Sequence, residues 1–82
     1  MLSVVYEPHF LKLICKIKDP VTKEKVKMQI AKIVENPEIG KPMRFDRKGT
    51  RELYVSPCRL SYIYLKQENK VVFLDLYHKN EQ

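Results

Sequence analysis

The chain has 82 residues, of which 44% are hydrophobic and 32% charged, and its net charge is +6 at pH 7. That size predicts a single domain over residues 1–82. No apolar run approaches the roughly 20 residues of a membrane span, and the start lacks the regions of a signal peptide, so we expect a cytoplasmic protein without membrane contact.

The excess of positive charge favours nucleic acid or an acidic protein as the partner. A solvated basic surface that keeps a small protein soluble would have the same composition. Cys15 and Cys58 are the only cysteines, and neither lies at a spacing typical of zinc ligands. We therefore expect reduced thiols, no metal and no cofactor.

The first half of the chain predicts one strand and two helices. Residues 2–6, "LSVVY", are rich in β-branched and aromatic residues, as strands are. A first helix of about three turns follows and should end near Lys18. Its apolar face comprises Phe10, Leu11, Leu13, Ile14 and Ile17. A second helix begins with Asp19 as its cap and Pro20 at its first position, and Asn36-Pro37 ends it.

Residues 37–50 are a loop by composition, although "MRFDR" within them alternates enough for a short strand. Three strands follow at 51–55, 59–66 and 71–77, joined by the turns "SPC" and "QENK". These spacings suit consecutive antiparallel strands. The prediction is an α+β fold: an N-terminal strand, a helical hairpin, then an antiparallel sheet of three to four strands packed on the helices.

Alternation along the strands predicts which side chains share a face. Arg59 and Ser61 should lie opposite Leu60 and Tyr62. In the last strand one face should carry Phe73, Asp75 and Tyr77, and the other Val72, Leu74, Leu76 and His78. Antiparallel pairing brings Arg59 to the end of that strand, which predicts a polar cluster of Arg59, Tyr77, His78 and Lys79. The alternative is that Arg59 only pairs with Asp75 or Glu52.

"RELYV" followed by "RLSY", between "VENPEIGKPMR" and "FLDLYHKNEQ", resembles the RelE/ParE toxin superfamily of toxin–antitoxin systems. The resemblance covers nearly the whole chain. It implies two helices on a curved antiparallel sheet. It also implies a ribosome-dependent mRNA endonuclease that inhibits translation by metal-independent cleavage, with the 2′-hydroxyl as nucleophile. The implied partners are the ribosome, mRNA and a RelB-like antitoxin, which we expect to be acidic and partly disordered.

The resemblance also implies the site residues. Arg59 matches the arginine that contacts the scissile phosphate, His78 matches a histidine of the YoeB-like branch, and Lys79 falls where that branch has a tyrosine. The expected catalytic residues are Arg59, His78, Arg51 and Lys79. The expected RNA-binding residues are Lys41, Arg44, Arg47, Lys48 and Tyr77. Arginine suits phosphate because its fork of donors grips two oxygens, and histidine transfers protons near neutral pH.

Two departures from the family pattern keep other functions open. Tyr54 stands where many members have a basic residue, and Met43 stands where the YoeB-like branch has a glutamate. One alternative is a ParE-like toxin that binds DNA gyrase without nuclease activity. Another is a degenerate member that binds RNA without cleaving it.

Overall fold

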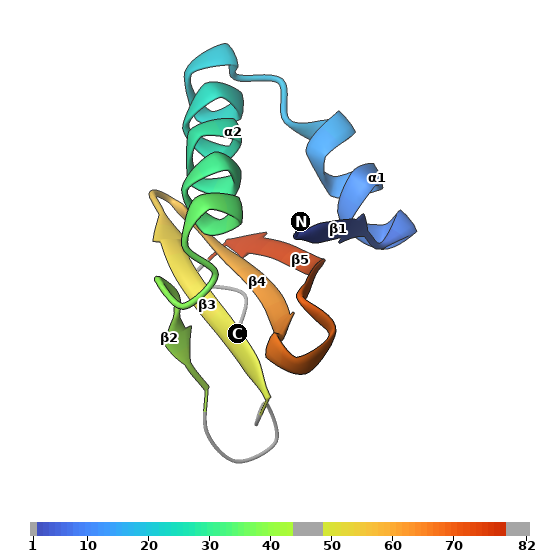
Figure 1. Cartoon of the computed structure of the whole chain (residues 1–82). Coiled ribbons are helices and arrows are strands. Elements are labelled where there is room, and N and C mark those ends of the chain that lie inside the picture. The colour runs from blue at the N-terminus through green and yellow to red at the C-terminus, as the bar shows by residue number, and fades with distance from the viewer. Residues whose placement is uncertain (1, 44–48, 79–82) are drawn as a thin grey trace.

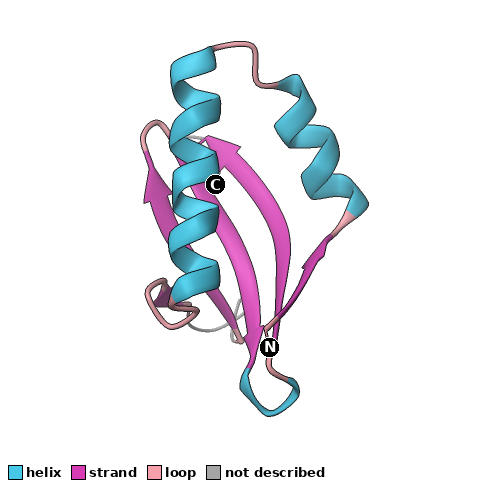
Figure 2. Cartoon of the chain, turned by 45° about the horizontal axis from the view of Figure 1, so that its top comes forward, coloured by secondary structure: helices cyan, strands magenta, loops and turns pink. Residues whose placement is uncertain are grey.

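The structure is a computed structural model that describes residues 2–43 and 49–78. Its elements in chain order are β1 (Ser3–Tyr6), α1 (Pro8–Lys16), α2 (Pro20–Glu35), β2 (Lys41–Pro42), β3 (Thr50–Val55), β4 (Cys58–Leu65) and β5 (Lys70–His78) (Figure 1). A single 3-10 turn over Lys66–Glu68 joins β4 to β5. The predicted α+β fold is confirmed, with both helices on one side of the sheet (Figure 2).

The sheet has five strands in the order β1-β5-β4-β3-β2. β1 runs parallel to β5, with Val4 opposite Val71, while the other neighbours are antiparallel. The sheet is therefore mixed and slightly larger than the predicted three to four antiparallel strands. The parallel pair joins residues almost seventy positions apart, a contact that no local pattern in the sequence reports.

The start of α2 is confirmed in atomic detail. Asp19 caps the helix: its carboxylate accepts the N–H of Val21 at 3.2 Å and the hydroxyl of Thr22 at 2.7 Å. These bonds hold the pKa of Asp19 below its ordinary value. Pro20 occupies the first helical position, where its missing N–H costs no hydrogen bond. The helix runs to Glu35, as the following Asn-Pro pair predicts.

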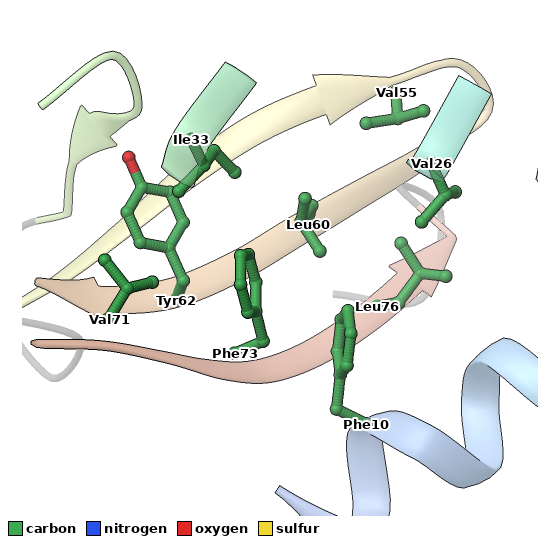
Figure 3. Close-up of a cluster of buried hydrophobic side chains, with 9 residues drawn as sticks. All are labelled: Phe10, Val26, Ile33, Val55, Leu60, Tyr62, Val71, Phe73 and Leu76. Atoms are coloured by element: carbon green, nitrogen blue, oxygen red, sulfur yellow. The ribbon is translucent and has the colours of Figure 1, made fainter. Parts of the chain in front are cut away.

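The core lies between the helices and the covered face of the sheet (Figure 3). Phe10 of α1 and Val26 and Ile33 of α2 point toward side chains from the strands. The nine buried core residues are Phe10, Val26, Ile33, Val55, Leu60, Tyr62, Val71, Phe73 and Leu76. Burial of one large apolar side chain stabilises a fold by roughly 1.5–3 kcal/mol, so this cluster fixes both helices on the sheet.

A β-bulge in β5 changes which of its side chains share a face. Ser61 pairs with Asp75 and the next residue, Tyr62, pairs with Phe73, so Leu74 is an extra residue without a partner in β4. Phe73 and Leu76 consequently both reach the core. The predicted grouping of Asp75 with Tyr77 agrees with the structure. The placement of Phe73 on that same face is wrong, because the bulge reverses the alternation that a regular strand follows.

Candidate functional site

We call the side of the sheet turned away from both helices its outer face. Strand pairing places two rows of polar side chains there. The arginine row consists of Tyr54, Arg59 and Tyr77, which are direct neighbours across β3, β4 and β5. The carboxylate row consists of Lys41, Glu52, Ser61 and Asp75, which are neighbours across β2, β3, β4 and β5. Same-face residues in a strand are roughly 7 Å apart, so the rows are adjacent.

Arg59 is at the centre of the arginine row. Its guanidinium lies 5.9 Å from the ring centre of Tyr54, and Nη1 lies 3.8 Å from Oε1 of Glu52. At 3.8 Å this ion pair is beyond hydrogen-bond distance, so the donors of Arg59 are not consumed by it. Nε is buried and has no hydrogen-bond partner among the described residues. Over a third of the side chain is exposed, which leaves Arg59 able to bind an anion.

Glu52 and Tyr77 form a hydrogen-bonded pair next to Arg59. The Tyr77 hydroxyl donates to Oε2 of Glu52 at 2.5 Å, a distance typical of a bond from a hydroxyl to a carboxylate. Glu52 is only 5% exposed. A buried carboxylate requires such partners, because burial of an isolated charge is costly. The pair places a base and a hydroxyl beside the arginine.

The structure places His78 on the other side of the sheet. Tyr77 pairs with Arg59, and His78 pairs with the neighbouring Cys58. His78 lines a hollow with Leu13, Lys16 and Ile17 of α1, where the helices lie. Successive side chains of a strand point to opposite faces, so Tyr77 lies on the face of its partner Arg59 and His78 on the face of Leu76. Tyr77 also lines this hollow, at the end of β5. The predicted cluster is thus assembled only in part.

Arg51 also faces the helices rather than Arg59. Its register partner is the buried Tyr62, and its Nη1 donates to the carbonyl oxygens of Glu38 at 3.1 Å and Gly40 at 2.9 Å. Both carbonyls belong to the loop between α2 and β2. In this position Arg51 fastens the loop to the sheet.

Tyr62 of β4 also holds the loop between α2 and β2 against the sheet. Its hydroxyl donates to the carbonyl of Pro37 at 2.7 Å and accepts the N–H of Gly40 at 2.8 Å. Burial raises the pKa of Tyr62 above its ordinary value of 10.0, although the Gly40 bond and the charge of Arg51 oppose the shift. A Cβ on Gly40 would lie 2.5 Å from the Tyr62 oxygen. Only glycine allows the backbone at position 40 to lie this close to the Tyr62 hydroxyl. The contact holds the chain just before β2, which carries Lys41.

Of the other predicted residues, Lys41 is exposed in β2 and lies on the outer face. Arg44, Arg47, Lys48 and Lys79 lie outside the described residues. Within residues 2–43 and 49–78 no group of three or more histidine, cysteine or acidic side chains is arranged to hold a metal. In those same ranges neither helix has the length and apolar character needed to cross a membrane.

The prediction did not identify Glu52, Ser61 and Asp75 as parts of one site. Alternation alone assigns Glu52 to the face of Tyr54, and Ser61 to the face of Arg59, so part of the signal was present in the sequence. Alternation also assigns Asp75 to the face of Tyr77. The missing information was the register between the strands, which makes Glu52, Ser61 and Asp75 direct neighbours.

No family model matches the chain, and no curated protein matches it. Solved structures do. The toxin–antitoxin complex RelBE2 of Mycobacterium tuberculosis contains a chain that is 22% identical, with a TM-score of 0.80 over 95% of this chain and 98% of that one. A YoeB/ParE toxin from Agrobacterium tumefaciens is 14% identical, with a TM-score of 0.82 over 94% and 98% of the two chains.

The intact RelBE toxin–antitoxin complex of E. coli also matches, at 18% identity and a TM-score of 0.77 over 95% of this chain and 96% of its counterpart. At these low sequence identities, the similarity over nearly whole chains is one of backbone fold. The chain has the RelE-like toxin fold.

Proposed function

We propose that this protein is the toxin of a toxin–antitoxin pair and an endoribonuclease that cleaves mRNA on the ribosome without a metal. Two observations support this proposal. The first is the fold, which is that of toxins. The second is the outer face, where Arg59 has an Nε without a hydrogen-bond partner among the described residues and lies beside the hydrogen-bonded pair of Glu52 and Tyr77. The observation that carries the proposal is Arg59, because a partly exposed arginine on the outer face of the sheet is suited to a phosphate.

The proposed reaction uses three groups of the outer face. Arg59 binds the non-bridging oxygens of the scissile phosphate and stabilises the charge that grows on them. Glu52 takes the proton of the 2′-hydroxyl, whose oxygen forms a bond to phosphorus. The bond from phosphorus to the 5′-oxygen breaks, and that oxygen takes the proton of Tyr77. Glu52 then returns its proton to Tyr77 along their hydrogen bond.

The products are a 2′,3′-cyclic phosphate and a 5′-hydroxyl, and the enzyme is regenerated. The proposal gives proton transfer to Glu52 and Tyr77 in place of His78, because His78 lies on the helix side. Lys41 would hold a backbone phosphate at the edge of the sheet. Arg44, Arg47 and Lys48 remain predicted RNA contacts, and Lys79 remains a predicted catalytic residue.

The proposed partners are the ribosome, mRNA and a RelB-like antitoxin in the cytoplasm. The net charge of +6 suits an acidic, partly disordered chain that folds on binding. Complexes of similar toxins with their antitoxins have been solved, which supports a protein inhibitor for this chain as well.

Induced expression in a bacterial host tests the proposal through Arg59→Ala. The wild-type chain should arrest growth and Arg59→Ala should not, since the phosphate contact is lost while the core stays intact. Lys66→Ala, which removes an exposed charge on the 3-10 turn, is the matched control and should arrest growth like wild type. Growth arrest by a folded Arg59→Ala protein would contradict the proposal.

A second candidate is a toxin of the same fold that binds DNA gyrase, or a member that binds RNA without cleavage. The observation that favours either is the position of His78 away from Arg59. In such proteins Arg59→Ala could weaken binding, but arrested cells would contain uncleaved mRNA. Induced DNA damage with intact mRNA would identify the gyrase inhibitor.

A further inference from the structure

A hollow of about 360 Å³ opens on the helix side of the sheet, between α1 and the neighbouring ends of β4 and β5. Leu13 and Ile17 of α1 and Leu76 of β5 give it apolar walls. Sites for small molecules measure roughly 300–1,000 Å³, so this hollow has room for a small one. Neither Arg59 nor Glu52 lines it.

A cysteine and a histidine are direct neighbours in this hollow. Cys58 is the first residue of β4, and its register partner is His78, the last residue of β5. Both residues line the hollow, so their side chains share the helix side of the sheet. Cβ atoms of directly opposite residues in an antiparallel pair are roughly 4.5–5.5 Å apart. The pairing therefore sets a nucleophile beside a base, the combination that activates thiols in enzymes.

The charges around Cys58 favour its reactive form. From α1 the hollow receives Lys16, and from β5 it receives His78 and Tyr77. The Tyr77 hydroxyl donates to Glu52, and none of the described residues that line the hollow is acidic. The thiolate is the nucleophilic form of cysteine, and positive neighbours stabilise it. The same lysine would attract an anionic reagent.

Cys15 provides a comparison within the same chain. Both thiols are reduced, and Cys15 is the more exposed of the two. It follows Ile14 in α1 and precedes Lys16, so a lysine is near it as well, but it does not line the hollow. Exposure alone would make Cys15 the faster thiol. The paired histidine and the hollow predict the opposite order.

We propose that Cys58 is a modification site whose thiol exchanges with small anionic disulfides, and that the hollow holds the attached group. His78 first takes the proton of the thiol. The Cys58 sulfur then bonds to one sulfur of the reagent, the S–S bond of the reagent breaks, and its other half leaves as a thiolate, which takes the proton from His78. Cys58 is oxidised to a mixed disulfide while half of the reagent is reduced to a thiol. The inference is independent of the proposed function.

The test uses dithiobis(nitrobenzoate), an aromatic disulfide with a carboxylate on each ring and a coloured thiolate as its product. Wild-type protein is treated at pH 7 with less reagent than thiol, and mass spectrometry locates the adducts. Cys58 should react at least about threefold faster than Cys15, since a larger thiolate fraction outweighs the lower nucleophilicity of each thiolate. This comparison requires no substitution and is made on the folded chain.

The role of His78 is tested in the Cys15→Ser background, where Cys58 is the remaining cysteine. Between pH 6 and pH 8 an ordinary thiol reacts roughly tenfold faster per pH unit, as its thiolate forms. The rate of Cys58 should rise less steeply, because His78 takes the proton. His78→Gln should restore the steep rise.

The role of Lys16 is tested in the same background with two reagents. Lys16→Gln should slow the reaction with dithiobis(nitrobenzoate) and leave the reaction with cystamine, a cationic disulfide, no slower. Lys12→Gln is the matched control, because Lys12 is an exposed lysine of α1 that does not line the hollow. It should slow neither reaction.

The inference is rejected if Cys15 of the wild-type protein reacts as fast as Cys58 or faster. Reaction of Cys58 only in denaturant would show that the hollow does not admit the reagent, and would reject it too. A pH profile of Cys58 that His78→Gln leaves unchanged would reject the histidine as the base.

Discussion

At the scale of single residues, the site is built on a buried carboxylate next to an arginine. Glu52 is 5% exposed, receives the Tyr77 hydroxyl at 2.5 Å and lies 3.8 Å from Arg59. A carboxylate buried with a partner at hydrogen-bond distance is fixed in place. The arginine, more distant and partly exposed, keeps its donors for a ligand. On this difference rests the proposal that Glu52 transfers a proton and Arg59 binds the phosphate.

Replacement of Glu52 by Gln tests that assignment. Glutamine can still accept the Tyr77 hydroxyl but cannot take a proton, so the cleavage rate should fall by about 10²–10⁴, the typical contribution of a general base. His78→Gln is the comparison and should change the rate by less than about threefold, because His78 faces α1. The rates come from single-turnover cleavage on programmed ribosomes.

If the cleavage rate fell about a hundredfold or more in His78→Gln and changed little in Glu52→Gln, His78 rather than Glu52 would be the general base. Circular dichroism of both variants would show that each is folded.

At the scale of elements, the position of β2 depends on two side chains of the covered face. Arg51 and Tyr62 make four hydrogen bonds to the loop between α2 and β2. Local signals in the sequence predicted the helix cap at Asp19 and the three consecutive strands. They did not predict the parallel pairing of β1 with β5 or the bulge at Leu74. Both depend on pairing across the sheet, which alternation within one strand does not contain.

For the same reason the candidate site was only partly predictable. Antiparallel pairing correctly brought Arg59 and Tyr77 together. Alternation had already assigned His78 to the face opposite Tyr77, but the expected cluster included both residues because they share the end of the strand. In a strand, however, the next residue points to the opposite face, and here that face meets α1.

Removal of the Tyr62 hydroxyl tests the role of the loop contacts. Tyr62→Phe loses a donor and an acceptor bond and leaves the Pro37 carbonyl and the Gly40 N–H without this partner. The free energy of unfolding should fall by about 1–3 kcal/mol, measured by urea denaturation. An unchanged midpoint would show that the loop does not depend on Tyr62.

The pH dependence of unfolding provides a second readout of Tyr62. Burial raises its pKa in the folded protein above the ordinary 10.0. A raised pKa means that the contribution to stability is complete below about pH 10 and is lost as the pH rises through the folded value. Wild type should therefore lose stability more steeply than Tyr62→Phe above pH 10. Parallel curves would contradict this account.

At the scale of the whole molecule, the two faces of the sheet differ in character. One face packs nine buried residues against the helices, and the other carries the arginine and carboxylate rows. With a net charge of +6, the molecule is suited to a polyanion. If the proposed function holds, a change at a partly exposed residue of the outer face such as Arg59 should reduce RNA cleavage and leave the protein folded, whereas a change in the core should destabilise the fold.

The most direct test of the central claim is the chemistry of the RNA ends after cleavage. Ribosomes programmed with a defined mRNA should yield a 2′,3′-cyclic phosphate and a 5′-hydroxyl when incubated with the protein. An mRNA with a single 2′-deoxy substitution at the cleaved nucleotide should stay intact, because its nucleophile is missing. Cleavage of the deoxy-substituted mRNA at the same place, or no cleavage of either mRNA by the folded protein, would contradict the account.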